Sequence, residues 1–188
     1  MASVFSHGLV ALVIGSVSAP RAIPKRFWAL SIICSILPDA DVIAFKFDIP
    51  YEHMFGHRGI SHSLLFAAML GIFVAFAFFS NMRTSVRWLL TLYFTLVTAS
   101  HAVLDAMTNG GLGVAFFAPF DEARYFLPWR PIVVSPIGIG SFFSAWGMRV
   151  IVSELLWVGL PAAGLALPLI LIRRFVVNRK TSPESELS

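Results

Sequence analysis

Five histidines and three aspartates stand in or beside apolar stretches of this 188-residue chain, where they could bind a metal ion. They are His7, His53, His57, His62 and His101, with Asp39, Asp41 and Asp105. Imidazole nitrogens and carboxylate oxygens, without thiolates, suit Zn²⁺ and also Mn²⁺ or Fe²⁺. The set predicts a site for one or two divalent ions, with zinc favoured.

The most specific motif is the string HRGISHS at residues 57–63, in which two histidines flank an arginine and a glycine. His101 and Asp105 form an HxxxD pair, and this i, i+4 spacing places both side chains on one face of a helix. Asp39 and Asp41 follow a proline, an arrangement that is also common at helix ends and turns. Taken alone, each aspartate could therefore orient or cap a neighbouring group instead of binding metal.

We assign predicted roles to seven of these residues and to Arg58. The predicted metal ligands are His7, Asp39, His62, His101 and Asp105. Asp41 and His57 are further ligands or orienting groups, and one of the two is the general base. Arg58 is expected to hold an anionic group of the substrate, although it could equally pair with Asp48 or Glu52.

The composition indicates the kind of fold that positions these groups. Hydrophobic residues make up 57% of the chain and charged residues 13%, against about 45–50% and about 25% in soluble domains. The mean hydropathy is +0.81. These values exclude a disordered chain and a disulfide scaffold, and they argue against a soluble globular enzyme. The single cysteine, Cys34, lies in an apolar run and is expected to be buried.

Five apolar stretches approach the roughly 20 residues that a helix needs to cross the membrane. They are residues 3–19, 27–45, 63–80, 86–104 and 151–172. Backbone groups in lipid must be satisfied internally, so we predict an all-α polytopic helix bundle of about five transmembrane helices. The first stretch could be mistaken for a signal peptide, but no basic residue precedes it, which favours a retained helix. Residues 105–150, rich in glycine, proline and aromatic residues, are predicted to form a long interfacial loop. A single domain over 1–175 and a polar cytoplasmic tail over 176–188 complete the prediction.

The distribution of charge predicts the orientation in the membrane. With five spans, nine Lys and Arg residues fall on the side of the C-terminus and five on the other side. The positive-inside rule then places the C-terminal side in the cytoplasm and all five histidines at the extracytoplasmic side. The basic pI of about 9.7 follows from this topology, so no nucleic-acid partner is expected.

Several of these motifs together resemble a known family. His7, PDAD at 38–41, GHRGISHS at 56–63 and SHAVLDAMTNGG at 100–111 are similar to the motifs of the YdjM-like family of inner-membrane metal-dependent hydrolases. The resemblance implies an inner-membrane location and metal-dependent hydrolysis. It also implies, for some members, binding to a regulator protein, the SOS-response repressor.

The expected function is therefore metal-dependent hydrolysis at the extracytoplasmic leaflet. Because the site is predicted to lie at the depth of the lipid headgroups, a phosphoester or lipid substrate is favoured, with membrane lipids as partners. Two alternatives remain. A divalent-metal transporter would need ligands near the middle of the membrane. A non-catalytic membrane protein that binds a partner would need no substrate.

Overall fold

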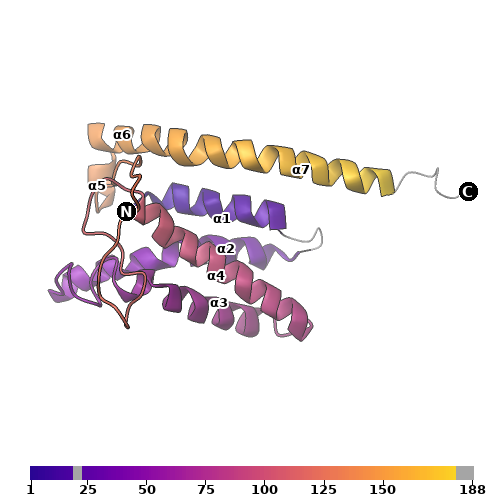
Figure 1. Ribbon diagram of the computed structural model, residues 1–188, viewed down its shortest axis with the longest axis horizontal. Helices are drawn as coiled ribbons and strands as arrows, with labels where there is room; N and C mark the ends of the chain where they lie inside the picture. The colour runs from indigo at the N-terminus through magenta and orange to yellow at the C-terminus, as the bar shows by residue number, and fades with distance from the viewer. Residues whose placement is uncertain (19–22, 181–188) are drawn as a thin grey trace, which may run out of the picture.

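The computed structural model describes residues 1–18 and 23–180 of the chain (Figure 1). In this described part the regular elements are helices, and no β-strand is present apart from isolated bridges between Thr108 and Ile132 and between Val114 and Tyr125. The predicted all-α fold is confirmed. Arg21 and the end of the expected tail, 181–188, lie outside the described residues.

Each of the five predicted spans is helical. The main helices are α1 (Val4–Ser18), α2 (Lys25–Ile36), α3 (Leu64–Phe78), α4 (Thr84–Ala106), α6 (Ala145–Glu154) and α7 (Leu160–Lys180). Within the described ranges, three stretches are long and apolar enough to cross a membrane: Lys25–Phe47, Thr84–Ala106 and Ala145–Ile172. The helices α1 and α3 are apolar but shorter. The chain is thus a polytopic membrane helix bundle.

Helix α4 is central, because it contacts α1, α2 and α3 (Figure 1). Phe27, Phe79 and Phe94 pack in the core between these helices, together with the buried Cys34. Gly71 allows α3 to lie close to α4, since a Cβ there would meet the Thr95 hydroxyl at 2.3 Å. Helices α6 and α7 run along the outside of the bundle, where α7 contacts α1.

Three helix boundaries differ from the prediction. One is the end of the last span, since α7 continues to Lys180 and includes residues 176–180 of the expected tail. The second span changes after Ile36 into a 3₁₀-helix, η1 (Leu37–Phe47), because Pro38 has no N–H to continue the α-helical hydrogen bonds. The last span begins at Ala145 and not at residue 151, because the Ser144 hydroxyl caps it by accepting from the Trp146 N–H. Glu154, expected near the start of that helix, is instead the last residue of α6, and a π-helical turn, η3 (Leu155–Gly159), follows it.

The connecting segments meet at one end of the bundle (Figure 1). This end holds the N-terminal residues 1–3, the connector 48–63 and the loop 107–144 with its short helix α5 (Ile139–Phe142). Backbone hydrogen bonds tie the segments together, from the Ser135 N–H to the Met1 carbonyl at 2.8 Å and from the Leu64 N–H to the Phe116 carbonyl at 2.9 Å. The long loop is therefore an ordered cover over this end, which also holds the predicted site.

Candidate metal centre

A group of four buried residues lies at this end of the bundle. Its members are Asp39, His62, His101 and Asp105. One possible ligand atom from each lies within 4.8 Å of the others, and each residue is at most 7% exposed. They come from three elements: η1, α4 and the single turn η2 (Ile60–His62). We refer to this group as the tetrad.

The two histidines of the tetrad point at each other through their Nε2 atoms, which are 3.0 Å apart. The opposite nitrogen of each ring has a partner. His101 Nδ1 donates to the Ser35 carbonyl at 2.7 Å, so a neutral His101 keeps a lone pair on Nε2. His62 Nδ1 lies 3.0 Å from the Ser61 hydroxyl and 3.1 Å from Asp41 Oδ2. A hydrogen bond at the distal nitrogen is the usual way in which proteins orient a metal-binding imidazole.

The two carboxylates of the tetrad lie near the facing Nε2 atoms of His62 and His101. Asp39 Oδ1 lies 3.3 Å from His101 Nε2, and Asp105 Oδ2 lies 3.5 Å from His62 Nε2. Among the residues that the structure describes, no hydrogen-bond partner satisfies either Asp39 oxygen. A buried carboxylate without partners is costly, and a cation would compensate it. The donor set and this unsatisfied carboxylate therefore fit a divalent metal ion.

His62 is surrounded by negative charge. Burial alone would lower its pKa, but hydrogen bonds to Asp105, Asp39 and Asp41 outweigh burial and raise the pKa of His62 to about 10. At neutral pH in the metal-free protein, His62 is therefore an imidazolium, with a proton on each ring nitrogen. The proton on His62 Nε2 can be donated to His101 Nε2, which accounts for their short separation. A metal ion would compete with that proton for the same position.

Asp41 organises the segment next to the tetrad. Its Oδ1 accepts from His57 Nδ1 at 2.6 Å, and its Oδ2 accepts from the Ser61 hydroxyl at 2.6 Å and from the Arg58 backbone N–H at 3.0 Å. Asp41, His57 and His62 also offer ligand atoms within 4.8 Å of one another. Because both Asp41 oxygens are already engaged, the contacts of Asp41 favour an orienting role.

Arg58 is fully buried, and its guanidinium is held inside the protein. Its Nε lies 2.9 Å from Asp105 Oδ2, Nη1 donates to the Gly110 carbonyl at 3.0 Å, and Nη2 donates to the Thr108 hydroxyl at 3.1 Å. Gly111 makes room for this arrangement, since a Cβ there would lie 2.8 Å from Nη1. These contacts indicate that Arg58 positions Asp105, whereas the sequence suggested a substrate anion, Asp48 or Glu52 as its partner.

His7 lies beside the tetrad but outside it. Its ring stacks on the ring of His101, with centroids 3.7 Å apart and planes 16° apart. Its Nε2 is 3.6 Å from Asp105 Oδ1, and neither ring nitrogen has a hydrogen-bond partner among the described residues. The structure thus brings His7 to the centre predicted for it, and its assignment as a ligand stays a prediction. His53, to which no role was assigned, is exposed.

One buried contact near the tetrad has no signal in the sequence. The Glu154 carboxylate accepts from both the backbone N–H and the hydroxyl of Ser3. The neighbouring Ala2 N–H donates to Asp105 Oδ1 at 2.7 Å. Glu154 therefore holds the N-terminal segment against the metal centre. The partners are 151 residues apart, so no spacing rule relates them.

The fold and the site together define an integral membrane protein with a buried Asp/His centre at one end of its helices. The family model described as "YdjM inner membrane protein" matches residues 1–178, and the chain belongs to that family. The chain is also similar to the inner membrane protein YbcI of Escherichia coli (strain K12), with 39% identity over 163 residues. That alignment covers 86% of this chain and 92% of YbcI. No solved structure matches the chain. The resemblance predicted from the motifs is confirmed, and the protein is an inner membrane protein.

Proposed function

We propose that this protein is a metal-dependent hydrolase that acts on a phosphoester or lipid at the extracytoplasmic leaflet. The observation that carries the proposal is the pair of Nε2 atoms on His62 and His101, 3.0 Å apart, with their distal nitrogens held by other groups. Two carboxylates complete the set. This arrangement is typical of a preorganised metal site, and it has no thiolate.

The tetrad would hold the ion, with His7 adjacent to it. Zinc is favoured by the nitrogen and oxygen donors, and manganese or iron would also suit them. One or two ions fit the proposal, since Asp41, His57 and His62 form a second group that shares His62 with the tetrad. A bound divalent ion supplies Lewis-acid polarisation of a substrate oxygen and of a water molecule.

His57 is the general base of the proposed reaction. Asp41 accepts from His57 Nδ1 at 2.6 Å, which fixes the tautomer and leaves Nε2 to take a proton. Asp41 is the less suitable base because hydrogen bonds already engage both of its oxygens. Arg58 holds the Asp105 carboxylate in place through the buried ion pair at 2.9 Å.

The position of the centre along the helices supports an extracytoplasmic site. His101 and Asp105 lie in the last turns of α4, whereas Arg83 and Arg87 stand at its start. The positive-inside rule assigns the basic end to the cytoplasm, which puts the tetrad near the outer headgroups. This depth suits hydrolysis of a lipid headgroup better than transport, for which ligands near the middle of the membrane are needed.

The test combines metal analysis with a hydrolysis screen. The purified protein is analysed for bound metal and then assayed with phospholipids and with bis-p-nitrophenyl phosphate. We expect His57→Gln to keep the ion of the tetrad and lose hydrolysis, while the matched variant of the exposed histidine, His53→Gln, keeps both. If the metal-loaded parent protein hydrolyses none of these substrates, the hydrolase proposal is wrong and a non-catalytic role for the centre takes its place.

A further inference from the structure

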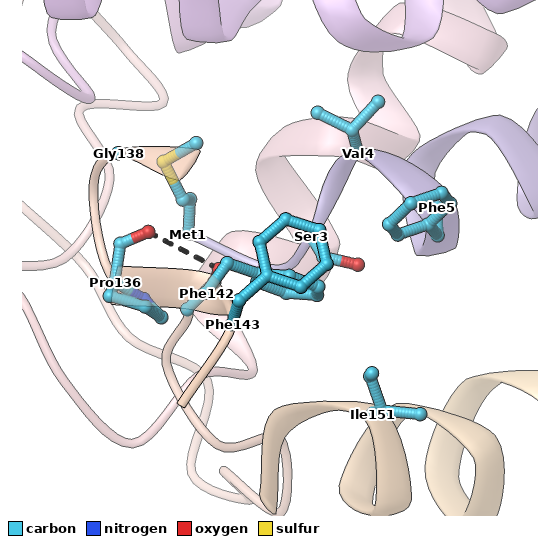
Figure 2. Close-up of a pocket in the computed structure, with 10 residues that line it drawn as sticks. Met1, Ser3, Val4, Phe5, Pro136, Gly138, Phe142, Phe143 and Ile151 are labelled. Atoms are coloured by element: carbon cyan, nitrogen blue, oxygen red, sulfur yellow. Dashed lines mark hydrogen bonds between the residues drawn. The ribbon is translucent and has the colours of Figure 1, made fainter. Parts of the chain in front are cut away.

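A cavity of about 520 Å³ opens next to the metal centre, between the start of α1 and the segment that leads into α6 (Figure 2). This volume is within the range of about 300–1,000 Å³ that is usual for small-molecule sites. The side chains around it are mostly apolar and come from three parts of the chain. Figure 2 shows Val4 and Phe5 from α1, Ile151 from α6, and Phe142 and Phe143.

The side-chain hydroxyls in the lining are already engaged. The Ser3 hydroxyl donates to Glu154, and the Ser135 hydroxyl donates to the Pro136 carbonyl at 3.4 Å. The Ser135 backbone N–H donates to the Met1 carbonyl. A ligand in this cavity would therefore find hydrocarbon contacts rather than hydrogen-bond partners, and its matching part must be apolar.

The cavity and the metal centre share a wall. Met1 and Ser3 both line the cavity. Ala2, between them, is fully buried, and its N–H donates to Asp105 Oδ1 on the other side at 2.7 Å. Residues 1–3 therefore form the wall between the cavity and the tetrad, so the cavity lies directly beside the tetrad.

The cavity also continues along the helices. A second cavity of about 300 Å³ shares Phe5 and Ile151 with the first and adds Leu9 and Leu155, which lie further along α1 and η3. Ser6 and Glu154 also line it, and the Glu154 carboxylate is engaged by Ser3. Helix α6 and η3 belong to the membrane-spanning stretch Ala145–Ile172. Both cavities therefore lie along a surface whose natural surroundings are lipid chains. The two cavities are neighbours along α1 and α6, and most of their lining residues are apolar, which suits a hydrocarbon chain.

We propose that these two cavities hold one acyl chain of a phospholipid, with its headgroup at the metal centre. This inference rests on the proposed function and names the feature of the substrate that the protein recognises. A substrate without a long hydrocarbon chain would lack this anchor.

The test fills the cavity without touching the metal centre. Ile151→Trp places a larger side chain where both cavities meet. Its matched control is Val152→Trp, since Val152 is next to it on α6, is similarly exposed at 49% against 44%, and is not among the described residues that line either cavity. Both variants are first shown to retain the parental helix content and elution volume.

Binding is measured on delipidated, chelator-treated protein, so that neither metal nor turnover enters the result. Dipalmitoyl phosphatidylglycerol is added, and retained lipid is counted by native mass spectrometry. We expect one bound lipid in the parent and in Val152→Trp, and binding weaker by about tenfold or more in Ile151→Trp, a loss typical of an overpacked site. Equal retention in all three proteins, or an equal loss in both variants, would overturn the inference.

A parallel measurement with free palmitate distinguishes the two sources of an acyl chain. Retention of palmitate without retention of the phospholipid would make a free fatty acid the occupant and contradict the proposal. The binding test and the hydrolysis screen can give different results. If lipid binding depends on Ile151 but the metal-loaded protein hydrolyses no lipid, the acyl-chain site is upheld and the proposal of lipid hydrolysis is wrong.

Discussion

His62 and His101 face each other through their Nε2 atoms at 3.0 Å inside the bundle. Two lone pairs at this distance would repel each other, so the pair needs a proton or a cation between its nitrogens. The raised pKa of His62, about 10, supplies the proton in the metal-free protein. A divalent ion in the tetrad would replace it.

Metal binding should therefore release about one proton per ion at pH 7, because His62 must lose its proton to become a ligand. The pKa of His62 is raised from 6.5 to about 10, so the apparent affinity should increase with pH across that interval. The same proton stabilises the metal-free fold, and this contribution is lost as the pH rises toward 10. Calorimetric Zn²⁺ titrations in buffers of different ionisation enthalpy measure the proton count. Zinc binding without proton release, and with the same affinity from pH 6.5 to 9, would contradict this exchange.

Asp41→Asn should weaken metal binding without abolishing it. Asp41 orients His62 directly and through Ser61, and loss of such a supporting group typically costs about 10–100-fold in affinity. The control is Asp48→Asn, because Asp48 is exposed and its left-handed backbone, with φ of 55°, tolerates asparagine. Competition with a zinc-sensitive dye measures both affinities. Equal affinity in the two variants would remove Asp41 from the support of the site.

Arg58→Met should destabilise the protein, because it removes the guanidinium that pairs with the fully buried Asp105. Removing one partner of a buried pair costs about 3–5 kcal/mol, which we expect as the loss in free energy of unfolding. Arg58→Lys restores the charge but not the three separate contacts, so it should recover only part of the loss. Denaturant titration in mixed micelles provides the measurement, with Arg130→Met at an exposed arginine as control. Comparable stability of Arg58→Met and Arg130→Met would show that the buried pair contributes little.

The orientation prediction follows from the basic residues at the end of the bundle away from the tetrad. A reporter that is active only in the cytoplasm, fused after Ser188, should give signal, and a periplasmic reporter at the same point should be silent. The opposite pair of results would invert the topology and move the centre to the cytoplasmic leaflet.

The parts of the site that local geometry determines could be predicted from the sequence. His101 and Asp105 share a helix face because i, i+4 spacing is a property of any α-helix, and both belong to the tetrad. His62 lies directly before α3, next to the start of the predicted span 63–80, because Ser63 caps this helix by accepting from the Phe66 N–H at 3.1 Å.

Contacts between distant segments could not be predicted in this way. The partner of Arg58 is Asp105, on another element, and only tertiary packing decides between it and the nearer Glu52. The contact between Glu154 and Ser3 has the same origin. The early start of α6 did have a local signal, because Ser144 is a favourable N-cap. The prediction missed it because it used only the apolar run, which begins at residue 151.

Binding of a metal ion by the tetrad is measured as the metal content per chain. The parent protein, His101→Ala, Asp105→Ala and the exposed-site control His53→Ala are purified, shown to be folded, and analysed by mass spectrometry for zinc, manganese and iron. We expect one or two ions per chain in the parent and in His53→Ala, and loss of that metal from the other two variants. Unchanged metal content in folded His101→Ala and Asp105→Ala would contradict this expectation.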